Sequence, residues 1–146
     1  MALAALNAHY GIERASAFYR FPAWPDPADP PFVNAAARLR QAPAPRDLLA
    51  GLHVIEAAFG RRRSRRNAPR TLDLDILAYG DRIQEGPPAL PHPGLETRAF
   101  VLAPLADIAP DFRSPRSRLT VAALLARAGD GEGAAFSPDF APQRLS

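Results

Sequence analysis

TLDLDILAY, the sequence of residues 71–79, is the segment from which the fold class is inferred. Apolar and acidic residues alternate in it, and a period of two is typical of a β-strand that is buried on one face. The apolar residues expected to point into the core are Leu72, Leu74 and Ile76. Asp73 and Asp75 then project together from the other face, and the strand ends at the turn residues Gly80 and Asp81.

Two carboxylates on one face of a strand lie roughly 7 Å apart at the backbone and repel each other unless a cation separates them. Mg²⁺ suits such a place, because it binds one or two carboxylates and completes its shell with phosphate oxygens and water. Asp73 and Asp75 are therefore candidate metal ligands. The alternative is an edge strand with a solvated acidic face, since this spacing of two aspartates is common.

An arginine-rich segment, residues 61–70 (RRRSRRNAPR), comes directly before this strand and holds six arginines and no acid. The whole chain has a net charge of +3, so the rest of the sequence is net acidic. Guanidinium groups beside carboxylates suit a magnesium polyphosphate, and Arg70 is the best placed because Pro69 holds it at the start of the strand. The segment could instead be a solvated loop, a nucleic-acid contact or a targeting patch.

The composition excludes several kinds of chemistry. All 18 basic residues are arginine, and the sequence has no cysteine. A lysine-containing phosphate loop and Schiff-base catalysis are therefore excluded, as are disulfides, thiolate metal sites and thiol nucleophiles.

The length of 146 residues suits one domain. Mixed helix and strand patterns predict an α+β domain over residues 1–128, and residues 129–146 are expected to be a loosely ordered tail. No apolar run is long enough to cross a membrane and no signal peptide is recognisable, so a cytoplasmic protein is expected.

The remaining elements follow from local patterns. Apolar spacing predicts helices over residues 1–10, 45–59, 96–107 and 120–128, and alternation predicts strands over residues 12–21 and 32–39. Gly60 is expected to stop the second helix, and Pro104 to bend or end the third. Thr120 is expected to cap the last helix.

Two further side chains could take part in chemistry. His92 stands between Pro91 and Pro93, where a stiff backbone gives its ring a defined direction. Near phosphates it could donate a hydrogen bond, although a lone histidine is more often structural. Glu56 lies on the second predicted helix, within a turn of the arginines, and could simply pair with one of them.

The order of the motifs resembles the 6-hydroxymethyl-7,8-dihydropterin pyrophosphokinase family. The most specific block is Gly60-Arg61-x-Arg63 followed by NAPRTLDLDIL at residues 67–77. Further blocks are FYR at 18–20 followed by Pro22, FVNAA at 32–36, Ile55-Glu56, LPHP at 90–93 and RAFVLxPLxxIAP at 98–110. Together they extend over roughly residues 2–125.

This resemblance implies a ferredoxin-like antiparallel sheet with helices packed on it. It implies transfer of pyrophosphate from ATP to 6-hydroxymethyl-7,8-dihydropterin, which gives the pterin diphosphate and AMP in folate biosynthesis. The expected partners are these small molecules alone, without nucleic acid or membrane, and the expected state is a monomer.

The resemblance also implies roles for particular residues. Two Mg²⁺ ions would lie on Asp73 and Asp75. The implied catalytic residues are Arg61, Arg63, Arg70 and His92, and the implied ATP-binding residues are Glu56, Arg70, Ile76, His92 and Arg98. The implied pterin-binding residues are Phe32, Asn34 and Phe100, which offer an amide for the ring edge and two aromatic faces.

The sequence departs from the family pattern in three places. Family members begin with a strand and a Gly-Ser-Asn turn before the first helix, so this chain, which starts within that helix, is expected to lack the N-terminal strand. Asn67-Ala68 replaces a Trp-Gly pair, for which Trp24 is a conceivable substitute, and Pro93 replaces a tyrosine.

The sequence is compatible with three functions. The first is the pyrophosphokinase. The second is a truncated, inactive remnant that only binds pterin or ATP. The third is a polyanion- or RNA-binding module that uses Arg61–Arg70, which is disfavoured because no aromatic residues interleave with the arginines.

Overall fold

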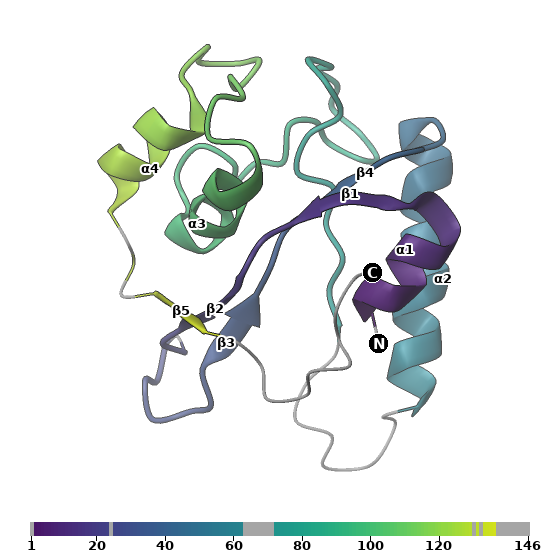
Figure 1. Ribbon diagram of the computed structural model, residues 1–146, viewed down its shortest axis with the longest axis horizontal. Helices are drawn as coiled ribbons and strands as arrows, with labels where there is room; N and C mark the ends of the chain where they lie inside the picture. Colours follow the sequence, from purple (N-terminus) through teal and green to yellow (C-terminus); the bar gives the residue numbers. More distant parts are fainter. Residues whose placement is uncertain (1, 24, 63–71, 130, 132, 137–146) are drawn as a thin grey trace.

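The structure, a computed structural model, describes residues 2–23, 25–62, 72–129, 131 and 133–136 (Figure 1). Its helices are α1 (Ala2–Tyr10), α2 (Pro45–Arg62), α3 (Ala99–Ile108) and α4 (Val121–Ala128). Its strands are β1 (Ile12–Ala15), β2 (Phe18–Phe21), β3 (Phe32–Asn34), β4 (Ala37–Leu39) and β5 (Ala134–Phe136). Antiparallel sheets with helices beside them confirm the predicted α+β class.

Two antiparallel sheets replace the two long strands that were predicted. β1 pairs with β4, while β2 lies between β3 and β5. The long strands are interrupted where Ser16 faces Ala36: the Ala36 N–H donates to Ser16 Oγ, and the Ser16 N–H donates to the Ala36 carbonyl, both at 2.8 Å. The serine hydroxyl thus replaces a backbone ladder contact, and the hairpin is divided there into two sheets.

Residues 72–79 are the main difference from the predicted strands. Their burial alternates as expected: Ile76 is 9% exposed, whereas Asp73 and Asp75 are exposed. Among the described residues, however, no strand pairs with this segment. Alternation predicts which side chains are buried, but a β-strand also needs a neighbour that completes its hydrogen-bond ladder.

Residues 134–136, within the predicted C-terminal tail, form β5. This strand pairs with the edge of β2, which offers unpaired backbone groups. Gly133 precedes it and lies against the Phe21 ring, so closely that a Cβ atom there would overlap the ring. Residues 137–146 of the expected tail lie outside the described residues.

Two helix boundaries also differ from the prediction. α2 continues through Gly60 to Arg62, because glycine ends a helix only where it takes a positive φ, and Gly60 does not. α3 begins at Ala99, three residues later than predicted, and Pro104 does not end it, since the helix continues to Ile108. The predicted cap of α4 is confirmed, since Thr120 Oγ1 accepts a hydrogen bond of 3.1 Å from the Ala123 N–H.

The apolar core has two parts, which lie on opposite sides of residues 72–79, the segment that carries Asp73 and Asp75. One part joins α1 and α2 and consists of Leu6, Leu48, Leu52, Ile55, Ile76 and Leu90. The other joins α3 and α4 and consists of Ala36, Leu95, Leu102, Leu105, Ile108, Val121 and Leu124. Figure 1 shows α1 and α2 on one side, α3 and α4 on the other, and the teal segment after α2 between them. Within the described residues, no helix has the length and hydropathy needed to cross a membrane.

Candidate active site

The segment that carries the acidic pair, Asp73 and Asp75, is held to the core, while the two aspartate side chains are exposed. The Leu72, Leu74 and Ile76 side chains that alternate with the pair contact the core around α1 and α2. Between the two acids, the backbone N–H of Leu74 donates to Glu56 Oε2 over 2.6 Å. The Asp75 side chain is 64% exposed. Two half-buried leucines, the buried Ile76 and a hydrogen-bonded backbone therefore hold two carboxylates toward solvent.

This donor set fits a magnesium ion that is shared with a ligand. Mg²⁺ prefers oxygen ligands and is usually held by one or two carboxylates plus phosphate oxygens and water. Within the described residues, no cluster of three or more His, Cys, Asp or Glu side chains could hold a metal by itself. Asp73 and Asp75 could thus supply part of a shell that a bound polyphosphate completes.

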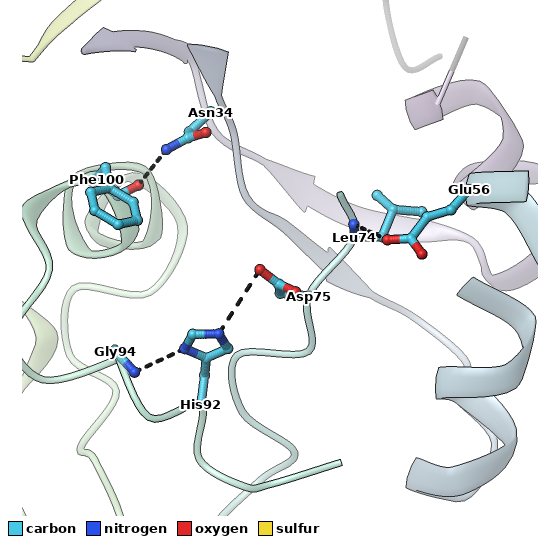
Figure 2. Close-up of polar contacts among 7 residues, drawn as sticks. All are labelled: Asn34, Glu56, Leu74, Asp75, His92, Gly94 and Phe100. Carbon is cyan, nitrogen blue, oxygen red and sulfur yellow. Dashed lines mark hydrogen bonds and ion pairs between the residues drawn. The ribbon is translucent and has the colours of Figure 1, made fainter. Parts of the chain in front are cut away.

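His92 faces the acidic pair in a fixed orientation (Figure 2). Its backbone N–H donates to the Leu77 carbonyl at 2.8 Å, which ties it to the segment that carries Asp75. Its ring Nδ1 accepts a hydrogen bond of 2.9 Å from the Gly94 N–H, so the proton of the neutral ring lies on Nε2. Nε2 is 3.9 Å from Asp75 Oδ2. The ring can therefore donate a hydrogen bond to an anion bound beside Asp75.

The three residues expected to bind the pterin lie close together. Phe32 on β3 is paired with Phe21 on β2, and the Phe21 ring meets the Phe100 ring edge-on at 6.3 Å. Asn34 donates from Nδ2 to the Phe100 carbonyl at 3.2 Å. Phe32 and Phe100 are 42% and 40% exposed. Exposed aromatic rings beside a carboxamide offer stacking surfaces and hydrogen bonds to a flat heterocycle.

Arg98, at the start of α3, extends over the aromatic group. Its guanidinium carbon lies 5.6 Å from the centroid of the Phe100 ring, a cation–π distance. Gly94 leaves room for this side chain, since a Cβ at that glycine would lie 2.6 Å from Arg98 Cδ. The positive charge is thus placed beside the expected pterin site and within four residues of the backbone that orients His92.

Three of the predicted site arginines are not among the described side chains. Arg63 and Arg70 lie outside the described residues, as does the side chain of Arg61. Ile76 is described, but its side chain belongs to the core, so only its backbone is available to a ligand. The Glu56 carboxylate is bonded to Leu74.

Sequence reasoning missed several supporting residues. Phe21, which is 4% exposed, supports the Phe100 ring from β2. Gly94 orients His92 through a backbone N–H, a group that every residue except proline carries, so no sequence pattern indicates this contact. Pro104, which lies inside α3, was identified in the sequence, but only as a residue expected to bend or end the helix.

A tyrosine–aspartate pair joins the sheet to α3. The Tyr19 hydroxyl donates to Asp107 Oδ1 at 2.8 Å, and the Ala17 N–H donates to Asp107 Oδ2 at 3.0 Å. Burial, followed by the hydrogen bond and the charge of Asp107, raises the pKa of Tyr19 to about 12. Since β3 carries Phe32 and Asn34 beside β2, this pair helps to hold the sheet against α3.

A second polar contact fixes the turn before α3. The Glu96 carboxylate accepts hydrogen bonds from the Ser114 hydroxyl and, at 3.0 Å, from the Ser117 N–H. The Ser114 hydrogen bond is the main reason why the pKa of Glu96 is below its ordinary value, although partial burial opposes the shift. Glu96 thereby ties residues 113–118 to the turn between His92 and Arg98.

Fold and site together define an α+β protein in which an acidic pair suited to magnesium lies near an aromatic group suited to a heterocycle. The chain belongs to the 7,8-dihydro-6-hydroxymethylpterin-pyrophosphokinase (HPPK) family, whose model matches residues 1–110.

Similar proteins carry the name 2-amino-4-hydroxy-6-hydroxymethyldihydropteridine pyrophosphokinase. The one from Synechocystis sp. is 44% identical over 122 residues, which cover 83% of this chain and 62% of the relative. The one from Pseudomonas aeruginosa is 52% identical over 94 residues, which cover 63% of this chain and 58% of the relative. The one from Haemophilus influenzae is 40% identical over 114 residues, 77% of this chain and 70% of the relative. The chain thus spans about three fifths of the length of the first two.

Proposed function

We propose that this chain transfers pyrophosphate from ATP to 6-hydroxymethyl-7,8-dihydropterin, giving the pterin diphosphate and AMP, as a step of folate biosynthesis. Membership of the family supports the reaction. The observation that carries it is the arrangement in Figure 2, where Asp75 lies between the Asn34–Phe100 pair and Glu56, with His92 beside it. Glu56, on the expected nucleotide side, and the Asn34–Phe100 pair, on the expected pterin side, thus flank Asp75.

Metal ions and side chains from several segments would hold the phosphates. Two Mg²⁺ ions at Asp73 and Asp75 would neutralise the triphosphate and so lower the cost of placing it beside the pterin hydroxyl. His92 donates from Nε2 to a phosphate oxygen, a direction that the Gly94 N–H determines. Arg98 approaches from the start of α3. Arg61, Arg63 and Arg70 are the further proposed phosphate contacts.

The nucleotide side would use the segment that follows α2. Ile76 contributes backbone groups to the adenine site, since its side chain is buried in the core. Glu56 was expected to bind ATP, and its bond to the Leu74 N–H supports an indirect contribution through the position of the acidic pair.

The pterin side would use Asn34, Phe32 and Phe100. The Asn34 carboxamide has one N–H on the Phe100 carbonyl and keeps Oδ1 and the other N–H for the edge of a ring. Phe32 and Phe100 supply the faces that stack on it and exclude water. Positioning of this kind is the main contribution of a protein to phosphoryl-type transfer.

We also infer a ferredoxin-like arrangement of the sheet. The β1–β4 and β2–β3 pairs would be two halves of one bent hairpin, as the Ser16–Ala36 contacts suggest. Residues 72–79 would join that sheet once a neighbouring strand completes their ladder. ATP and the pterin are the proposed partners, without nucleic acid or membrane, and a cytoplasmic monomer is the proposed state.

The test is AMP formation from ATP in the presence of Mg²⁺, with and without the reduced pterin. We expect AMP only when the pterin is present, and a loss of kcat of about 100-fold or more in Asp75→Ala. Asp81→Ala, which removes an exposed carboxylate in the turn after the segment, is the matched control. AMP release that does not require the pterin, or that survives Asp75→Ala, would contradict the proposal. Binding of pterin and ATP without AMP formation would favour the inactive remnant.

A further inference from the structure

Phe100 contributes two different groups to the aromatic site. Its ring is 40% exposed and is supported edge-on by Phe21. Its backbone carbonyl accepts a hydrogen bond from Asn34 Nδ2 at 3.2 Å. This second contact is unusual, because a carbonyl in the first turn of an α-helix normally accepts from the backbone N–H four residues later.

Pro104 explains why the Phe100 carbonyl is available. It is the residue four positions after Phe100 and lies inside α3, which continues to Ile108. Proline has no backbone N–H, so the α-helical partner of the Phe100 carbonyl does not exist. The Asn34 side chain, which comes from β3 on the neighbouring sheet, supplies a donor in its place (Figure 2).

The contact fixes which end of the Asn34 carboxamide points away from α3. A carbonyl oxygen only accepts hydrogen bonds, so the end that meets Phe100 has to be the NH₂ group. Oδ1 then has no partner among the described residues and points elsewhere, together with the second N–H. An acceptor beside a donor is complementary to the edge of a lactam or guanidine-like ring, which offers a donor opposite the acceptor and an acceptor opposite the donor.

We propose that Pro104 is a positioning residue for the pterin site: by removing one helix hydrogen bond, it makes the Phe100 carbonyl the anchor that orients Asn34. The proposal rests on the proposed function for the identity of the ligand. Pro104 acts through the backbone and Asn34, and does not itself touch the ligand.

The surroundings of Pro104 support a specific role for this proline. Proline is the least favourable residue for a helix interior, yet Pro104 is fully buried between core residues of α3. The buried neighbours Leu102 and Leu105 hold the helix together around it. A bend of α3 for better packing is the competing explanation, and it predicts no special connection with Asn34.

A double-mutant cycle separates the two explanations. The variants are Pro104→Ala, Asn34→Ala and the double variant, with Pro110→Ala as a control at an exposed proline outside the helices. In Pro104→Ala the new N–H takes the Phe100 carbonyl. We expect the Kd for the reduced pterin to rise about 3- to 10-fold, the worth of one hydrogen bond, while the Kd for ATP stays unchanged.

In the Asn34→Ala background, Pro104→Ala should have no further effect on pterin binding. An equal loss in both backgrounds would overturn the proposal in favour of a packing role. The side-chain amide signals of Asn34 in ¹⁵N–¹H NMR spectra of the ligand-free protein provide a second readout. They should shift in Pro104→Ala and not in Pro110→Ala, and unchanged signals would overturn the proposal. If the unaltered chain binds no pterin, the proposed function fails, and the amide signals still decide whether Pro104 orients Asn34.

Discussion

The Glu56 carboxylate accepts a hydrogen bond of 2.6 Å from the backbone N–H of Leu74, the residue between Asp73 and Asp75. Glu56 lies on α2, so this contact ties the acidic pair to the helix that precedes it. It leaves both aspartates exposed while it holds the backbone between them. A carboxylate placed behind metal ligands is a common means of orienting them.

Glu56→Ala is therefore expected to weaken magnesium binding without removing a ligand. The loss of an outer contact of this kind typically lowers metal affinity by about 10- to 100-fold. We expect a shift of this size in the Mg²⁺ concentration that supports half-maximal ATP binding, measured by titration calorimetry.

Glu56→Gln is the matched variant, because its amide oxygen can still accept from the Leu74 N–H. It should keep most of the magnesium affinity. If Gln and Ala are equally harmful, the charge of Glu56 matters by itself, and a direct contact with the metal or nucleotide would replace the orienting role.

Gly94→Ala tests the space beside Arg98. The new Cβ would lie 2.6 Å from Arg98 Cδ and 2.9 Å from Nε, so the arginine side chain has to move. The Gly94 N–H remains, and His92 keeps its orientation. Since the arginine is a flexible and exposed side chain, we expect the KM for ATP to rise while the melting temperature hardly changes.

Thr97→Ala is the control for this change, because it alters an exposed neighbour without entering the space of Arg98. A large fall in the melting temperature of Gly94→Ala, or an unchanged KM, would show that the displacement of Arg98 does not matter to the nucleotide.

The sequence predicted the burial pattern of the site better than its hydrogen bonds. Alternation identified Ile76 as buried and Asp73 and Asp75 as exposed, because burial follows from the chemistry of each side chain. Strand formation in the same residues depends on a second segment, and alternation carries no information about that partner. The length of the strand on either side of Ser16 was overestimated for the same reason, since the interruption depends on Ala36.

The orienting contacts could not be predicted because they use the backbone. Gly94, Leu74 and Phe100 act through N–H or carbonyl groups that nearly all residues possess. Only the folded chain shows which of these groups reaches a site side chain. For Pro104 the local rule indicated a bend or an end of the helix, whereas burial of the surrounding helix face keeps α3 continuous to Ile108.

Glu96→Gln is expected to reduce the sensitivity of the fold to acid. Because its hydrogen bond with Ser114 lowers the pKa of Glu96, the folded state favours the ionised form. That stabilisation is present above the ordinary glutamate pKa and is lost as the pH falls through the lowered value. The free energy of unfolding, measured with urea from neutral pH down to about pH 3, should therefore fall less steeply in the variant.

Glu85→Gln removes an exposed glutamate and is the control for this series. Equal slopes for Glu96→Gln and the unaltered chain would mean that the contact between Glu96 and Ser114 does not contribute to stability in acid.

Tyr19→Phe should have the corresponding effect at alkaline pH. Burial and Asp107 raise the pKa of Tyr19 to about 12, so the folded state favours the neutral phenol. The resulting stabilisation is complete below the unfolded pKa of about 10 and is lost as the pH rises toward the folded value. The free energy of unfolding should fall more steeply over this range in the unaltered chain than in Tyr19→Phe.

The absorbance of tyrosinate in the folded protein is a second measurement, and it should lose its latest-titrating component in Tyr19→Phe. Tyr79→Phe, which should keep that component, is the control, because it removes a hydroxyl that donates instead to the Pro43 carbonyl at 2.8 Å. If the late component survives in Tyr19→Phe, another tyrosine is the source, and the link from Tyr19 to Asp107 does not hold the sheet against α3.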